Sequence, residues 1–156
     1  MDLASLTALR TPAGAALLAG IGDYDSGLAL ALGARLRERH PGNAGLVAAA
    51  MTQARLRTRA LGKFGPDASR IWFTPAGLEQ ASRFEVAERR AARFASLGLA
   101  STGGVTGGRA GGAGSDRVAD LGCGLGADSF ALARAGLRVL AIERDPVTAA
   151  LARANA

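Results

Sequence analysis

The hydrophobic pattern of the first hundred residues predicts helices separated by short polar breaks. Apolar residues recur at helical spacing over 44–63, and the predicted buried face holds Leu46, Val47, Ala50, Met51, Ala54 and Leu61. Residues 27–39 are rich in Ala, Leu, Arg and Glu, which favours a second helix that ends at the HPGN stretch. A shorter helix is expected near 13–19.

The IWFTP stretch, residues 71–75, predicts the start of another helix. Thr74 suits the N-cap position and Pro75 the first helical position. The helix should run to about Leu97, with an interruption near 83–85. Trp72 and Phe73 have two interpretations, because aromatic rings stack on RNA bases but more often anchor a helix in a core. We favour the core.

The pattern changes near residue 116. A strand is predicted over 117–121, a helix over 127–135 and a second strand over 137–142, whose mostly apolar sequence suits burial on both faces. Asp145 and Pro146 then suit the start of another helix. This order has the size of a β-α-β unit, so we expect an α/β fold with a helical N-terminal region.

Four segments follow from these patterns. A stretch in which seven of 15 residues are glycine separates the helical part from the β-α-β unit, and we interpret it as a flexible linker. The expected segments are a helical region (1–66), a connecting helix (67–100), the Gly-rich linker (101–115) and the β-α-β unit (116–156).

Composition and charge narrow the classes of function. The chain is 49% hydrophobic, and this fraction excludes wholesale disorder. Its net charge of +6 is compatible with an RNA partner. Four basic residues lie close together in the 44–63 helix, and they either follow an RNA backbone or form a solvated face: Arg55, Arg57, Arg59 and Lys63.

Several kinds of site and location are not expected. One cysteine allows no intrachain disulfide, and no signal peptide or membrane span is recognisable, so we expect a cytoplasmic protein without a membrane partner. One histidine, one cysteine and scattered carboxylates make no metal site.

The DLGCGLGADS stretch, residues 120–129, carries the candidate chemistry. It follows a predicted strand and opens a predicted helix, and Glu143 ends the next strand. Gly122 permits a tight exit from the strand, Gly124 lets a ligand approach the backbone, and Gly126 lets the helix lie close to the sheet. Glu143 can accept hydrogen bonds from two ribose hydroxyls, which indicates a ribose-bearing cofactor.

The residue that leads the motif distinguishes between cofactors. Gly122, Gly124 and Ala127 fit the G-x-G-x-x-G/A pattern of dinucleotide sites. Asp120, however, would repel a pyrophosphate and attract the ammonium and sulfonium groups of S-adenosylmethionine. The motif therefore favours S-adenosyl-L-methionine.

Residues 118–146, VADLGCGLGADSFALARAGLRVLAIERDP, resemble the first β-α-β unit of class I S-adenosylmethionine-dependent methyltransferases. Residues 52–95, from TQARLRTRALGKF through RIWFTPAGLEQ to AARFA, resemble the helical region of a bacterial methyltransferase group whose members end in a THUMP-like domain. The resemblance spans about 44–156.

The resemblance implies a Rossmann-like methyltransferase sheet and an RNA substrate. It also implies cofactor contacts at Asp120, Gly122, Gly124 and Glu143, with Gly126 as part of the loop and Asp128 as a lower-ranked neighbour. Cys123 is expected to be a small loop residue and not a nucleophile.

From the two strands after residue 116 we expect an N-terminal fragment of a methyltransferase, truncated before the catalytic face, with unknown catalytic residues beyond residue 156. Such a chain should transfer no methyl group and bind the cofactor weakly. The alternatives are a fragment of an NAD(P)-dependent oxidoreductase and a non-catalytic helical interaction module.

Overall fold

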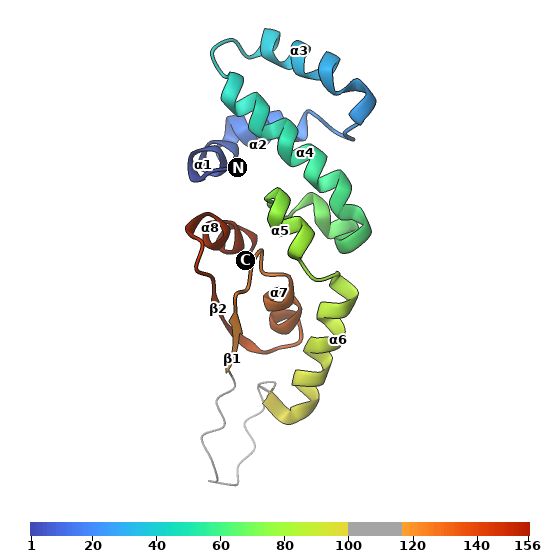
Figure 1. Ribbon diagram of the computed structural model, residues 1–156, viewed down its shortest axis with the longest axis vertical. Coiled ribbons are helices and arrows are strands. Elements are labelled where there is room, and N and C mark those ends of the chain that lie inside the picture. The colour runs from blue at the N-terminus through green and yellow to red at the C-terminus, as the bar shows by residue number, and fades with distance from the viewer. Residues whose placement is uncertain (100–116) are drawn as a thin grey trace.

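The computed structural model describes residues 1–99 and 117–156, which are mostly helical and include one two-stranded parallel sheet (Figure 1). The predicted Gly-rich linker, 101–115, lies outside the described residues. In chain order the elements are α1 (Leu3–Leu9), α2 (Pro12–Ala19), η1 (Ser26–Leu28), α3 (Ala29–Arg39), α4 (Ala44–Phe64), η2 (Gly65–Ser69), α5 (Pro75–Gln80), α6 (Phe84–Phe94), η3 (Ala95–Leu99), β1 (Arg117–Leu121), α7 (Ala127–Arg134), β2 (Arg138–Ile142) and α8 (Pro146–Asn155).

These elements confirm the predicted α/β mix and most predicted boundaries. The Asp145 carboxylate caps α8 by accepting a hydrogen bond from the Thr148 amide at 2.7 Å. Helix α1 was not predicted, although its cap is visible in the sequence, since the Asp2 carboxylate accepts from the Ser5 amide at 2.8 Å. Seven residues are too few for a clear helical period, and burial of Leu6 and Leu9 stabilises α1.

Helix α4 takes part in two hydrophobic cores on different faces. Its first half packs with α2 and α3 through residues such as Val47 and Ala54, whereas its second half packs with residues 68–73 through Leu56 and Phe64. The predicted single buried face is therefore wrong at Leu61, which is 55% exposed. The two halves of α4 bury different faces. Leu61 lies on the face of Val47 and Ala54, which is buried only in the first half of the helix.

The predicted helix from Pro75 to Leu97 is divided into α5 and α6. Thr74 caps α5 as predicted, since its hydroxyl accepts from the Gly77 amide at 2.9 Å. Ala81 and Arg83 have extended backbones, with ψ of 139° and 142°, which places the interruption about two residues before its predicted position. The segment between residues 67 and 99 is therefore not one connecting helix.

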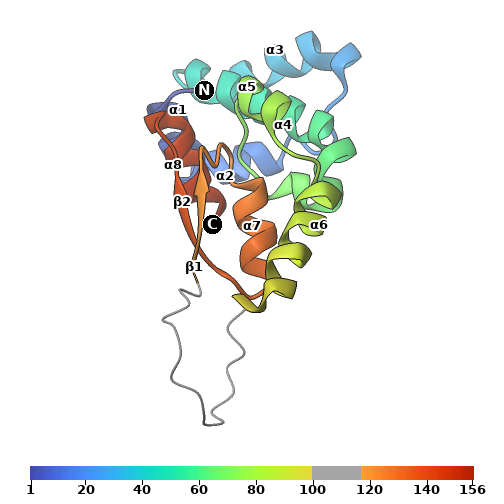
Figure 2. The ribbon, with the colours of Figure 1, turned by 60° about the horizontal axis from the view of Figure 1, so that its bottom comes forward.

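The β-α-β unit packs on α6 through α7, which covers one face of the two-stranded sheet. Helix α7 lies between the two strands and α6 (Figures 1 and 2), and Val118 joins Ala131 and Ala87 in the core between these layers. The other face is uncovered in the part that the structure describes, where Leu121 is 74% and Leu140 58% exposed. The prediction that the second strand is buried on both faces is therefore wrong, because α7 covers one face only.

No helix in the described part of the chain is both long and apolar enough to cross a bilayer.

Candidate cofactor site

The glycine loop, residues 122–126, joins β1 to α7 at the carboxyl ends of the two parallel strands. Gly122, Gly124 and Gly126 have φ angles of 75°, 57° and 89°, a region that side chains disfavour. The amides of Gly122 and Cys123 both donate to the Ile142 carbonyl, at 2.8 and 3.0 Å. The end of β2 thus holds the beginning of the loop, and the loop needs glycine at these positions.

Glu143 follows β2 and lies against the glycine loop. One carboxylate oxygen accepts from the Gly124 amide at 3.0 Å and the other from the Asp145 amide at 2.9 Å. These hydrogen bonds hold the pKa of Glu143 below its ordinary value, and the bond from the Asp145 amide has the largest effect. Glu143 therefore stays ionised beside the loop, with lone pairs left to accept further hydrogen bonds.

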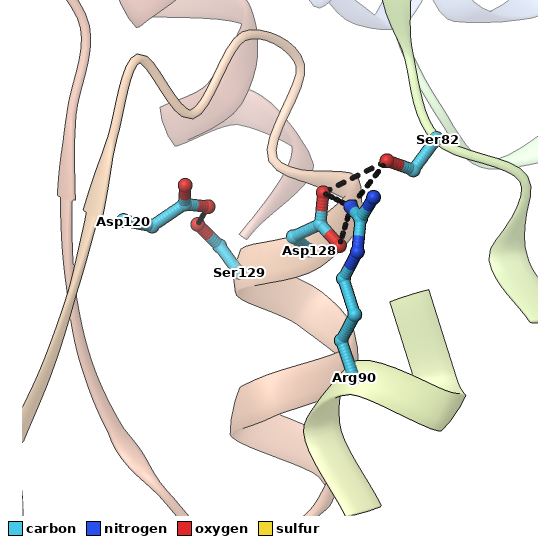
Figure 3. A network of polar contacts seen from close by, with 5 residues as sticks. All are labelled: Ser82, Arg90, Asp120, Asp128 and Ser129. Atoms are coloured by element: carbon cyan, nitrogen blue, oxygen red, sulfur yellow. Dashed lines mark hydrogen bonds and ion pairs between the residues drawn. The ribbon is translucent and has the colours of Figure 1, made fainter. Parts of the chain in front are cut away.

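Asp120 lies at the end of β1 and is half-buried. Its carboxylate accepts a hydrogen bond from the Ser129 hydroxyl on the first turns of α7, at 2.6 Å (Figure 3). Asp120 thus connects β1, which precedes the glycine loop, to α7, which follows it. Its carboxylate lies next to the loop but does not line the cleft described below.

Asp128 connects α7 to the helical region. Its carboxylate accepts from the Ser82 hydroxyl at 2.9 Å and forms an ion pair with Arg90 at 3.0 Å (Figure 3). Arg90 also donates to the Ser82 hydroxyl at 2.9 Å. The partners of Asp128 come from the α5–α6 connection and from α6, so its first role in this structure is to tie these elements to α7.

A cleft of about 260 Å³ lies between the glycine loop and α5. Of the predicted site residues, Gly122, Gly124 and Glu143 line it, whereas Asp120 and Gly126 do not. The lining includes the carboxylates of Asp128, Glu143 and Asp145, and none of the described residues that line it is Lys or Arg. A chain with a net charge of +6 therefore forms an acidic cleft at this loop.

The helical region supplies one wall of the cleft, which the sequence patterns did not predict. That wall consists of Thr74, Ala76, Gly77, Gln80, Ala81 and Ser82. A side chain at Gly77 would lie 2.8 Å from Cγ of Leu125, so α5 rests directly on the glycine loop. The Thr74–Pro75 signal marked the start of α5, but no local pattern shows which distant loop a helix packs against.

Cys123 is half-buried in the loop. Burial, followed by the nearby carboxylates of Asp120 and Glu143, raises the pKa of its thiol. A thiol in this state is a poor nucleophile at neutral pH, which agrees with the prediction of a small loop residue.

Most of the basic residues grouped in α4 bind within the chain. Arg57 donates to the Ile71 carbonyl at 3.2 Å and its guanidinium lies 4.9 Å from the centre of the Trp72 ring. Arg59 pairs with Glu79, and the Lys63 ammonium donates to three carbonyl oxygens at the end of α5. Three of the four basic residues of this group therefore already have partners within the chain.

Of the two adjacent aromatic residues, Phe73 is fully buried and Trp72 is half-buried. Phe73 packs edge-on against Phe64 with ring centroids 5.3 Å apart. This confirms the interpretation that the pair anchors the helical region in its core.

Within residues 1–99 and 117–156, no group of three or more His, Cys, Asp or Glu side chains is placed to hold a metal ion.

A family model matches the N-terminal part of the chain. Residues 2–60 match a family model described as "Domain of unknown function (DUF8688)", which covers less than half of the chain, from α1 into α4. No curated protein and no solved structure matches the chain. The family match lies outside the glycine loop, so the chemistry of the site must be argued from its geometry.

Proposed function

We propose that the chain binds S-adenosylmethionine in the acidic cleft, as the cofactor-binding part of a class I methyltransferase with a Rossmann-like sheet. The observation that carries the proposal is the cleft's lining of three carboxylates without Lys or Arg among its described residues. Arg90 pairs with Asp128, whereas Glu143 and Asp145 form no ion pair with another described residue. Such a site attracts the ammonium and sulfonium of this cofactor and repels the pyrophosphate of a dinucleotide.

The residues of the loop fit the rest of the cofactor. A Cβ built at Gly124 meets nothing within 4 Å, so a ligand can approach the backbone there. Glu143 stands at the end of β2 with lone pairs for ribose hydroxyls, and Asp120 adds a carboxylate behind the loop. When bound, S-adenosylmethionine supplies an electrophilic methyl group; these residues hold the cofactor, and we assign none of them a catalytic role.

RNA is the methyl acceptor we propose, on the strength of the family resemblance and the net charge of +6. The basic residues of α4 contribute little to this argument, because Arg57, Arg59 and Lys63 already bind within the chain. Fluorescence anisotropy with a single-stranded RNA at several salt concentrations tests the acceptor class, since phosphate contacts make affinity fall as salt rises.

The cofactor is tested by nuclear magnetic resonance titration of the ¹⁵N-labelled chain, which detects weak binding. S-adenosylmethionine should shift the amides of Gly122, Gly124 and Thr148, and Glu143→Gln should weaken this binding. Glu38→Gln, at an exposed acid of α3 outside the cleft, is the matched control and should leave the binding unchanged. Shifts with NAD⁺ and none with S-adenosylmethionine would favour the oxidoreductase alternative, and no shift with either would favour a non-catalytic module.

A further inference from the structure

The extended segment of Trp72 and Phe73 is held by two side-chain amides. On one side, Asn155 of α8 accepts from the Trp72 amide at 2.7 Å and donates to the Trp72 carbonyl at 3.1 Å. On the other side, Gln53 of α4 accepts from the Phe73 amide at 3.1 Å and donates to the Phe73 carbonyl at 2.6 Å. Each side chain thus pairs with one residue's backbone as a neighbouring strand would.

Asn155 differs from Gln53 in the partner of its third contact, because the Gln53 amide nitrogen also donates to the Met1 sulfur, at 3.9 Å, and not to the glycine loop. Nδ2 of Asn155 also donates to the Leu125 carbonyl at 3.1 Å. Leu125 stands between Gly124 and Gly126 in the glycine loop. An asparagine amide has two N–H donors, and here the two go to Trp72 and Leu125. One side chain therefore connects the Trp72 segment of the helical region to the middle of the loop.

The side chain of Leu125 is held as well. It is 3% exposed and belongs to the core that contains Phe64, Phe73 and Leu78. The three glycines around it have no side chains to restrict their backbones, so the loop loses much conformational entropy when it becomes ordered. The contacts of Leu125 are the means by which the rest of the fold supplies that order.

We infer that Asn155 is a positioning residue for the glycine loop: through the Leu125 carbonyl it holds the loop in the conformation that forms the cleft, and links that conformation to the Trp72–Phe73 segment. Without this hydrogen bond the loop populates other conformations, and a ligand that needs the cleft binds more weakly by the fraction of competent molecules. The affinity part of the inference rests on the proposed function, and the loop conformation does not.

Two matched variants test the inference. Asn155→Ala and Gln53→Ala each leave one backbone N–H and one backbone carbonyl of the 72–73 segment without their partner, but only Asn155→Ala releases the Leu125 carbonyl. Both should lower thermal stability. Only Asn155→Ala should move the amide resonances of Gly124 and Gly126 in the ligand-free protein, and it should weaken S-adenosylmethionine binding about tenfold, equivalent to ~1.4 kcal/mol.

Asn155→Asp is the second variant and decides the question if Asn155→Ala does not fold. It is nearly isosteric and keeps an acceptor for the Trp72 amide, but as a carboxylate it has no donor for the Leu125 carbonyl. It should reproduce the loop shifts. The inference is overturned if the loop resonances stay in place in the Asn155 variants, or if Gln53→Ala moves them equally. If the unmodified chain does not bind S-adenosylmethionine, the proposed function fails, and the ligand-free resonances still decide the role of Asn155.

Discussion

Gln53 and Phe73 lie 20 residues apart in the sequence, yet the amide of the Gln53 side chain forms both hydrogen bonds with the Phe73 backbone. Both residues are fully buried. Phe73 lies in an extended segment that pairs with no strand in the described structure, so its N–H and carbonyl would otherwise be buried without partners. The buried Gln53 side chain of α4 therefore forms the two hydrogen bonds that a neighbouring strand would otherwise form with Phe73.

Replacement of Gln53 should destabilise the fold strongly. Gln53→Ala leaves two buried backbone groups unpaired, and we expect a loss of about 2–4 kcal/mol in the free energy of unfolding. Urea denaturation followed by circular dichroism measures this change. Thr52→Ala, on the neighbouring position of α4, is the control and should cost much less. Equal losses for the two variants would contradict the role of Gln53.

A methyl group at Gly77 should disturb the glycine loop. In Gly77→Ala the new Cβ would lie 2.8 Å from Leu125 Cγ and from the Thr74 hydroxyl, which requires a shift of the loop or of α5. We expect a loss of about 1–3 kcal/mol from overpacking. Leu125→Ala should relieve part of the clash, so the double variant should lose less stability than the sum of the single losses. A strictly additive double-mutant cycle would show that Gly77 and Leu125 do not interact.

Lys63 should act as a stabilising residue and not as an RNA contact. Its ammonium donates to the carbonyls of Leu78, Glu79 and Ala81, where α5 ends, so Lys63→Met should lose about 1–2 kcal/mol of stability. Arg55→Met on the same helix is the control. RNA binding by the folded Lys63→Met protein should change no more than that of Arg55→Met, and a larger drop at Lys63 would show that the ammonium reaches RNA.

The thiol of Cys123 should react slowly at neutral pH. Because burial and the carboxylates of Asp120 and Glu143 raise its pKa, alkylation by iodoacetamide at pH 8 should be slower in the folded chain than in the chain unfolded in urea. Glu143→Gln removes one of the charges, so it should lower the thiol pKa and speed the reaction.

The same shift predicts a sign for the pH dependence of stability. A raised pKa in the folded state means that the fold favours the protonated thiol. This contribution is present below the pKa of the unfolded thiol and is lost as pH rises through that of the folded thiol. Cys123→Ser should remove this alkaline loss. A folded chain that reacts faster than the unfolded one would contradict both predictions.

Local patterns were enough to predict most elements and the candidate loop. Thr74 and Asp145 cap their helices as the sequence indicated, and β1 has the predicted boundaries. The three glycines of the loop adopt positive φ, and Glu143 lies beside them. Capping, helical period and backbone freedom depend on residues a few positions apart, so these features can be read from a single chain.

Long-range packing decided the rest. The exposure of Leu61 depends on which face of α4 packs against other elements in the second half of the helix. The exposure of Leu140 depends on which faces of the sheet are covered. Neither can be read from hydrophobicity, because an apolar side chain is buried only if another element packs against it.

The sequence thus determined the helices, the strands and the glycine loop, whose causes are local steric and hydrogen-bonding preferences. Only the tertiary structure decided that α5 forms a wall of the cleft, that the cleft is acidic in a basic chain, and that Asn155 joins Trp72 to Leu125. These relations connect residues that are distant in the chain, and they arise because buried polar groups must find partners and apolar faces must be covered wherever the fold brings them together.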